Sequence, residues 1–178
     1  MKLDRYWLVL VAANLVLLAL GAMVNDGLAG WSVSVFFIGP CVVWPALRLS
    51  PGWLLLCLGI SGLAGDAALP TPPGFLLSLF LLGAIFILAI RTRLGRIRRT
   101  QQIGLAWLLN AAYFAAFTGW AVSRHPVFGP AFFERVAVDF GLSQIVVLPV
   151  ALWFFDFQES ALAFAGLTAA TPRAEEAC

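Results

Sequence analysis

Long apolar segments separated by short polar or turn-forming stretches make up most of this chain. The apolar segments cover residues 6–24, 31–47, 53–69, 75–90, 103–122 and 136–155. Each is close to the about 20 residues that a helix needs to cross the hydrocarbon core of a bilayer. Because lipid offers no hydrogen-bond partners, a spanning segment must pair its own backbone groups, and a helix does so within one segment. The pattern therefore predicts an all-α polytopic membrane protein with six transmembrane helices.

Three of the apolar segments contain residues that modify this picture. The second segment, residues 31–47, is short and contains Pro40 and Pro45. A proline inside a helix removes one backbone donor and bends the helix, so we expect a kinked helix here. Asn14 in the first segment and Gln144 in the sixth are polar side chains at membrane depth, and we expect each to hydrogen-bond to a neighbouring helix.

The composition narrows the class of protein. Hydrophobic residues make up 62% of the chain and charged residues 11%, and the mean hydropathy is +0.95, which excludes an ordinary soluble domain. The net charge of +2 is too small to indicate nucleic-acid binding. The three cysteines have no paired spacing, so they indicate neither a disulfide framework nor a zinc site. We expect a transmembrane domain over residues 1–160 and an amphipathic or disordered cytoplasmic tail over residues 161–178.

Basic residues are unevenly distributed among the connections. With six spans and a cytoplasmic amino terminus, nine of the eleven Lys and Arg residues fall on the cytoplasmic side, and only Arg124 and Arg135 fall outside. This is the asymmetry that the positive-inside rule requires, so both termini are predicted to be cytoplasmic. The densest basic stretch follows the fourth segment and consists of Arg91, Arg93, Arg96, Arg98 and Arg99. We interpret it as a topology anchor that contacts anionic lipid; docking of a cytoplasmic partner is the alternative.

The third segment carries the most unusual residue, Asp66. A carboxylate at the centre of a transmembrane helix costs roughly 2.5–3.5 kcal/mol on insertion scales, so it needs a stabilising partner. We expect Asp66 to bond to the start of the fourth helix around residues 71–75, or to pair with Arg124 or Arg135. Asp139 falls in the expected first turn of the sixth helix, where a carboxylate complements the helix dipole.

Small residues surround Asp66. Gly59 and Gly62 precede it at helical spacing and Gly65 adjoins it, which allows another helix to approach closely. This stretch therefore predicts a packing or binding surface.

The chain lacks recognisable catalytic patterns. No HExxH, G-x-S-x-G or phosphate-binding glycine loop occurs in it. The polar residues expected inside the membrane, Asn14, Asp66, Asn110 and Gln144, are few and scattered. These observations predict a protein that is not an enzyme and that uses no cofactor or metal.

Three features together resemble a known family. They are the G-x-x-G-D sequence of Gly62–Asp66 followed by Gly74, the basic loop Arg91–Arg99, and a final span Gln144–Phe155 that contains Pro149. In layout, residues 6–158 resemble the bacterial rod shape-determining protein MreD.

The resemblance implies a non-enzymatic subunit of the cell-wall elongation complex in the bacterial cytoplasmic membrane. Such a subunit binds the single-span protein MreC and, through it, MreB, RodA and a penicillin-binding transpeptidase, and it helps to position peptidoglycan synthesis. The resemblance implies that the glycines of the third segment and Asp66 are packing determinants. With the other polar and turn residues noted above, the helix-packing or partner-binding candidates are Gly59, Gly62, Gly65, Asp66, Gly74, Asn110 and Gln144.

A second resemblance stays open. The substrate-binding membrane subunits of energy-coupling-factor vitamin transporters are also small six-helix proteins without catalytic motifs. They bind a vitamin near the outer face, where Asp66 and the loop over residues 123–135 would lie. Few polar and aromatic ligand groups gather in the spans of this chain, which disfavours that alternative.

Overall fold

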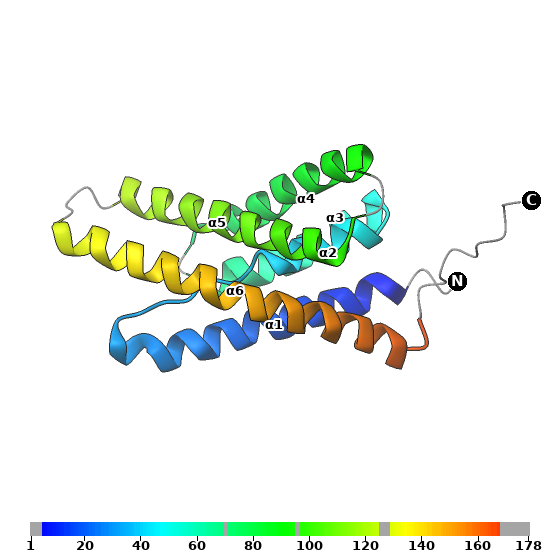
Figure 1. Cartoon of the computed structure of the whole chain (residues 1–178), viewed down its shortest axis with the longest axis horizontal. Coiled ribbons are helices and arrows are strands. Elements are labelled where there is room, and N and C mark those ends of the chain that lie inside the picture. Colours follow the sequence, from blue (N-terminus) through cyan, green and yellow to red (C-terminus); the bar gives the residue numbers. More distant parts are fainter. Residues whose placement is uncertain (1–4, 70, 95–96, 125–128, 168–178) are drawn as a thin grey trace, which may run out of the picture.

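The computed structural model describes residues 5–69, 71–94, 97–124 and 129–167. Most of its described residues are helical and none forms a strand, so the prediction of an all-α membrane protein is confirmed. Within these described ranges, five helices are long and apolar enough to cross a membrane. The elements in chain order are α1 (Tyr6–Leu28), the 3-10 turn η2 (Ala29–Trp31), α2 (Pro40–Arg48), α3 (Pro51–Ala68), α4 (Phe75–Leu94), α5 (Arg99–Arg124) and α6 (Pro130–Phe164) (Figure 1).

The prediction of a kinked but continuous second helix is wrong. Residues 33–38 have no regular secondary structure, and α2 contains only nine residues. Pro40 occupies the start of α2, where its missing N–H removes no helical hydrogen bond, so this proline begins a helix and does not bend one. We call residues 32–48 the broken span.

The first connection also differs from expectation. Asn25, Asp26 and Gly27 fall between the first two apolar segments, where a connection is expected, yet all three lie inside α1. The chain instead reverses after η2, at Ser32, which has a positive φ of 55°. The side chain of Asn25 stabilises the segment that follows this reversal. It accepts a hydrogen bond from Val35 N (2.8 Å) and donates one to Val35 O (3.0 Å). Asparagine is common in turns, but here Asn25 lies within α1 and binds the backbone of the segment that follows.

The bundle has two chemically distinct ends. Figure 1 shows α1 beginning and α6 ending at the same end, together with the end of α4 and the start of α5. We call this the basic end, because its described arginines include Arg48, Arg91, Arg93, Arg98 and Arg99. Arg124 and Arg135 belong to the opposite end. Arg96 lies outside the described residues. The separation of charge matches the predicted topology, whose cytoplasmic assignment stays a prediction.

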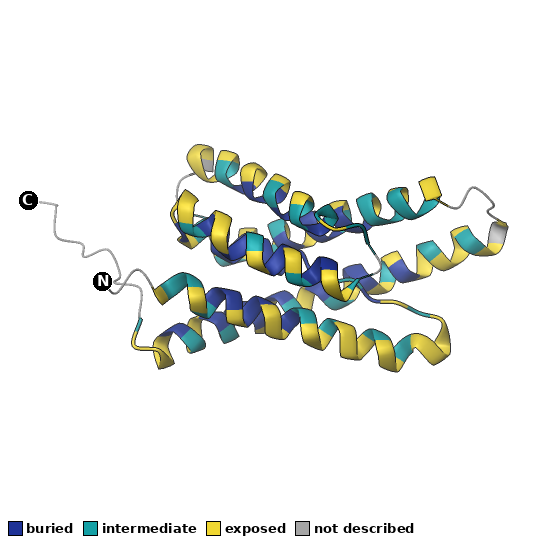
Figure 2. Ribbon diagram, turned by 180° about the vertical axis from the view of Figure 1, so that it is seen from behind, coloured by how far each residue is buried: buried dark blue, intermediate teal, exposed yellow. Residues whose placement is uncertain are grey.

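The helices differ in how far they reach. At the opposite end, α1, α5 and α6 extend beyond the connection between α3 and α4 (Figures 1 and 2). The 35 residues of α6 form one helix about 52 Å long. This helix continues through Phe164, so the expected domain boundary at residue 160 falls inside it.

Burial follows the pattern expected of a membrane protein. Figure 2 shows buried residues in the middle of the bundle and exposed residues on its outer faces. The largest fully buried side chains include Trp44, Phe80, Phe154 and Phe155. Large apolar side chains also face outward, among them Leu82 and Ile145. Outward apolar faces on long helices are stable in lipid, which supports a membrane-embedded protein.

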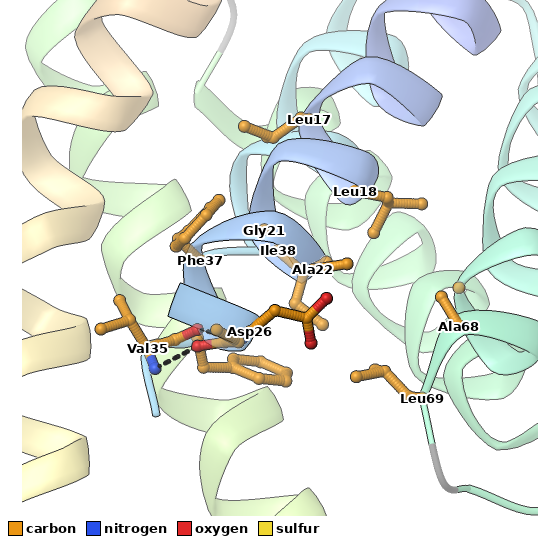
Figure 3. A pocket seen from close by; sticks show the side chains of 13 residues that line it. Leu17, Leu18, Gly21, Ala22, Asp26, Val35, Phe37, Ile38, Ala68 and Leu69 are labelled. Carbon is orange, nitrogen blue, oxygen red and sulfur yellow. Dashed lines mark hydrogen bonds between the residues drawn. The ribbon is translucent and has the colours of Figure 1, made fainter. Parts of the chain in front are cut away.

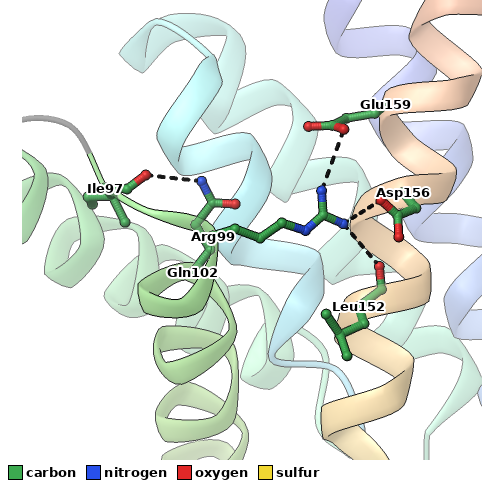
Figure 4. A network of polar contacts seen from close by, with 6 residues as sticks. All are labelled: Ile97, Arg99, Gln102, Leu152, Asp156 and Glu159. Atoms are coloured by element: carbon green, nitrogen blue, oxygen red, sulfur yellow. Dashed lines mark hydrogen bonds and ion pairs between the residues drawn. The ribbon is translucent and has the colours of Figure 1, made fainter.

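Arg99 connects two helices at the basic end. Its guanidinium pairs with Asp156 and Glu159 on α6 and also donates to the carbonyl of Leu152 (Figure 4). Arg99 was predicted to anchor the topology, and it also ties the start of α5 to the last part of α6. Arg91, in contrast, reaches α2 by a hydrogen bond from Nη1 to Ala46 O (3.4 Å).

Candidate functional site: the broken second span

Non-helical backbone inside a membrane protein requires hydrogen-bond partners from elsewhere in the chain. In the broken span, α5 supplies them through one side chain. Asn110 Oδ1 accepts from Gly39 N (3.2 Å), and Asn110 Nδ2 donates to Phe36 O (2.8 Å). Asn110 is fully buried. One amide group therefore pairs two backbone groups that have no helical partner.

α6 pairs the first part of the same segment. Asp139 accepts from Ser34 N (3.1 Å) and from Ser34 Oγ (2.9 Å). Ser143 Oγ accepts from Phe36 N (2.9 Å) and donates to Asp139 O (2.6 Å). The prediction that Asp139 complements a helix dipole in a first turn is wrong, because α6 begins earlier, at Pro130. Its carboxylate instead serves the backbone of the broken span.

α2 contains a second proline, Pro45, and a side chain of α1 pairs the carbonyl group that this proline leaves unpaired. Pro45 has no N–H, so the carbonyl of Cys41, four residues earlier, loses its helical donor. Asn14 Nδ2 donates to Cys41 O (3.1 Å) and to Ser61 Oγ (3.1 Å). Gln158 Nε2 donates in turn to Asn14 Oδ1 (3.5 Å). The expectation that Asn14 bonds to neighbouring helices is confirmed.

The broken span approaches the backbone of α5 closely at Gly39. A Cβ added there would lie 2.8 Å from Asn110 N and against the carbonyl of Ala106. Real Cβ atoms do not come so close, so only glycine allows this contact. Sequence reasoning did not identify Gly39; its position directly before Pro40 in an apolar run is the signal that was available.

The Asp66 carboxylate accepts hydrogen bonds from the connection between α3 and α4 and from the start of α4. Its Oδ1 accepts from Leu76 N (2.6 Å) and Thr71 Oγ1 (3.4 Å), and its Oδ2 from Gly74 N (2.9 Å) and Leu77 N (3.4 Å). This confirms the expected bonding to the start of the fourth helix. Among the described residues, neither Arg124 nor Arg135 forms an ion pair with Asp66, and Arg135 lies 3.9 Å from Asp139 instead. The carboxylate also complements the dipole at the amino-terminal end of α4.

The candidate glycines differ in their surroundings and in their backbone conformation. A Cβ on Gly62 would lie 2.7 Å from Leu77 Cα, and one on Gly65 would meet the side chain of Leu76. These two glycines let α3 and α4 pack closely. Gly74 has a φ of +88°, which the connection before α4 requires. Gly59 differs, because no described heavy atom lies within 4 Å of a Cβ placed there.

The packing glycines give a matched prediction. Replacing Gly62 with leucine is expected to lower the free energy of unfolding by about 1–3 kcal/mol, the usual cost of overpacking, because the backbone of Leu77 cannot yield as a side chain could. Replacing Gly59 with leucine should change it by less than about 0.5 kcal/mol, as for other open surface positions. Denaturant unfolding of both variants in detergent measures the difference. Equal losses would contradict the assignment of Gly62 to the contact with α4.

Gln144 does not fulfil its expected role. The side chain is buried, yet neither Nε2 nor Oε1 has a hydrogen-bond partner among the described residues. The prediction that Gln144 bonds across helices is therefore wrong for this part of the chain. Two other polar residues on α6, Asp139 and Ser143, instead make the hydrogen bonds from this helix to the broken span.

A cavity of about 150 Å³ lies beside the broken span. Its walls come from the last turns of α1, residues 35–38 and the end of α3 (Figure 3). Most of the lining is apolar, and the polar exceptions are Asn25 and Asp26. Within the described ranges, no group of three or more His, Cys, Asp or Glu side chains could hold a metal ion.

Comparisons with protein-family models, with curated proteins and with solved structures found no match to this chain. Its function must therefore be argued from its own residues.

Proposed function

We propose that this protein is a non-enzymatic membrane subunit of the bacterial cell-wall elongation complex, as the resemblance to MreD implies. In this proposal it binds a single-span protein of the MreC type and, through it, MreB, RodA and a penicillin-binding transpeptidase. Its place is the bacterial cytoplasmic membrane, with both chain termini in the cytoplasm.

The observation that carries the proposal is the use made of the buried polar side chains. Asn14, Asp66, Asn110 and Asp139 all bond to backbone groups that the helices leave unpaired. Catalysis or transport requires polar groups that are directed at a substrate. Here these groups fix the connections and the broken span, which favours a rigid subunit that acts through its outer surface.

The outer face of α3 is the surface that best fits a partner helix. Its exposed apolar residues follow helical spacing and are Leu55, Leu56, Ile60 and Leu63. Gly59 lies among them with open space above it. A small residue between larger apolar ones lets a second transmembrane helix approach the backbone closely. We propose this face, called the α3 face below, as the contact for the partner's transmembrane helix.

A pull-down from the native host tests the function. The tagged protein, extracted in mild detergent, is expected to recover an MreC-like protein together with other wall-synthesis proteins, identified by mass spectrometry. Replacing Gly59 with leucine should reduce this recovery about tenfold, since a leucine there would keep the partner helix from the small-residue contact. Gly104→Leu on α5, where a Cβ also meets open space, is the matched control and should keep full recovery.

Two results would count against the proposal. If Gly59→Leu recovers as much of the partner as the wild type does, the α3 face is not the partner's contact. Recovery of an ATPase pair with a coupling membrane subunit would replace the proposed function with vitamin transport.

The vitamin-transport alternative requires a ligand cavity, and one cavity lies beside the broken span. Pockets for drug-sized ligands usually enclose about 300–1,000 Å³, whereas this cavity has about 150 Å³. The cavity is therefore too small for a vitamin in the present arrangement, and we place the alternative second.

A further inference from the structure

A groove between α4 and α5 lies on the outer surface of the bundle. It has a volume of about 400 Å³, and its walls include Leu82 and Phe86 on α4 and Leu108 and Ala112 on α5. These four side chains are exposed, and none of them is polar. In a membrane, an apolar group has to fill the groove, because an empty one forfeits packing contacts.

The floor of the groove is formed by close contact between the two helices. Gly83 and Tyr113 line it and are buried, and a Cβ on Gly83 would collide with the Tyr113 hydroxyl. Nearer the opposite end, the rings of Phe75 and Trp120 pack with 5.7 Å between their centroids. A transmembrane helix with its side chains is about 10–12 Å in diameter, whereas α4 and α5 touch along this floor. The groove therefore favours a narrow, flexible chain, such as the acyl chain of a lipid, over a partner helix.

The position of Arg93 connects the groove to the basic end. Arg91 reaches α2 through its bond to Ala46 O, and Arg93, two residues later, lies roughly 200° further round α4. Arg93 is also seven residues beyond Phe86. That spacing places the two on the same side of the helix, with Arg93 about 10 Å nearer the basic end. The apolar stripe of the groove on α4 thus ends in a positive charge.

Arg98 brings a second cation to the same end of the groove. It directly precedes α5, and the end of α4 and the start of α5 lie together (Figure 1). Arg99 is directed to α6 by its pairs with Asp156 and Glu159. The stretch of α4 that is long enough to cross a membrane ends at Arg93, so at this depth lipid headgroups surround the two arginines. Basic residues at this level favour anionic headgroups.

From this juxtaposition we propose that an anionic phospholipid binds here, with one acyl chain in the groove between α4 and α5 and its phosphate group at Arg93 and Arg98. We call this the lipid site. A topology anchor needs only a general attraction between the basic stretch and anionic lipid, whereas the lipid site holds one molecule at two arginines and in one groove. The lipid site is independent of the α3 face and of the proposed function, because neither requires the groove.

Native mass spectrometry of the delipidated full-length protein in detergent tests the lipid site. The protein is titrated with phosphatidylglycerol or with phosphatidylcholine that carries identical acyl chains. Each arginine near the membrane surface strengthens binding of an anionic headgroup about fivefold, so the wild type should prefer phosphatidylglycerol about 25-fold. Arg93→Gln should lower this preference to about fivefold. Arg124→Gln, which removes an exposed arginine from the last turn of α5 at the opposite end, should keep the full preference.

A matched pair of variants tests where the acyl chain lies. Ala112→Phe fills the groove between α4 and α5 and should weaken phosphatidylglycerol binding about tenfold, close to the loss of two buried CH₂ groups. Ala115→Phe, in the neighbouring groove between α5 and α6, should leave the binding unchanged. A Tm without added lipid close to that of the wild type shows that each variant is folded.

Three results would overturn the proposal. The first is equal binding of the two lipids by the wild type, and the second is an unchanged preference in Arg93→Gln. The third is an Ala112→Phe variant that binds phosphatidylglycerol as the wild type does. If that variant also loses the partner in the pull-down, the groove holds a partner helix and not a lipid.

Discussion

Replacing Asn110 with leucine is expected to lower the free energy of unfolding by roughly 2–6 kcal/mol, from about 1–3 kcal/mol for each buried backbone group left unpaired. The groups are Gly39 N and Phe36 O, which pair with the two ends of the Asn110 amide. Water cannot replace them easily, because Asn110 is fully buried. Denaturant unfolding in mixed micelles, followed by tryptophan fluorescence, measures the loss.

The control for Asn110 lies on the same helix. Thr118→Val also exchanges a polar for an apolar residue on α5, beside the apolar groove that α5 forms with α6, and it should cost less than about 0.5 kcal/mol. Asn110→Asp keeps the oxygen that accepts from Gly39 N but loses the donor to Phe36 O, so its effect should be intermediate. If Asn110→Leu is as stable as Thr118→Val, then Asn110 does not hold the broken span.

Asp66→Ala is expected to lower the free energy of unfolding by about 3 kcal/mol. A hydrogen bond to a charged group contributes about 1.5–3 kcal/mol, and two short ones are lost, from Leu76 N and Gly74 N. The start of α4 also loses its favourable charge at the helix dipole. Thermal and denaturant unfolding in detergent would both report the change.

A second variant and a second readout separate structure from partner binding at this position. Asp66→Asn keeps one acceptor oxygen and should lose about half as much stability, while Glu134→Gln controls for the removal of one charge. If Asp66→Ala keeps wild-type stability but fails to recover the partner in the pull-down, Asp66 would belong to the partner interface and its role as a cap would be wrong.

Local features of the sequence were sufficient to predict part of this structure. The apolar segments gave the long helices, and the expected bonding of Asp66 was met because its partners lie only 5–11 residues away. The prediction for Asn14 was confirmed because it required only a hydrogen bond to some neighbouring helix. Predictions of this kind depend on the cost of a lone polar group in lipid, which is the same in many folds.

The broken span could not be predicted in the same way. Its apolar composition is that of a helix, and its two prolines are compatible with a kink. The non-helical segment is stabilised by polar side chains that hydrogen-bond to its backbone. These side chains lie 71–107 residues further along the chain. Only the packing of α5 and α6 against the segment shows that Asn110, Asp139 and Ser143 act together. The same limit explains Gln144, whose environment no local pattern describes.

The distance along the chain between the broken span and its partners also has a consequence for biogenesis. During synthesis, residues 33–38 leave the ribosome long before α5 and α6 exist, and in lipid their unpaired backbone groups are costly. The segment can therefore reach its final arrangement only after the last helix has inserted, so assembly is completed from the carboxyl-terminal side. A chain that stops before residue 130 would lack Asp139 and Ser143, and quality-control proteases would meet an incompletely paired span.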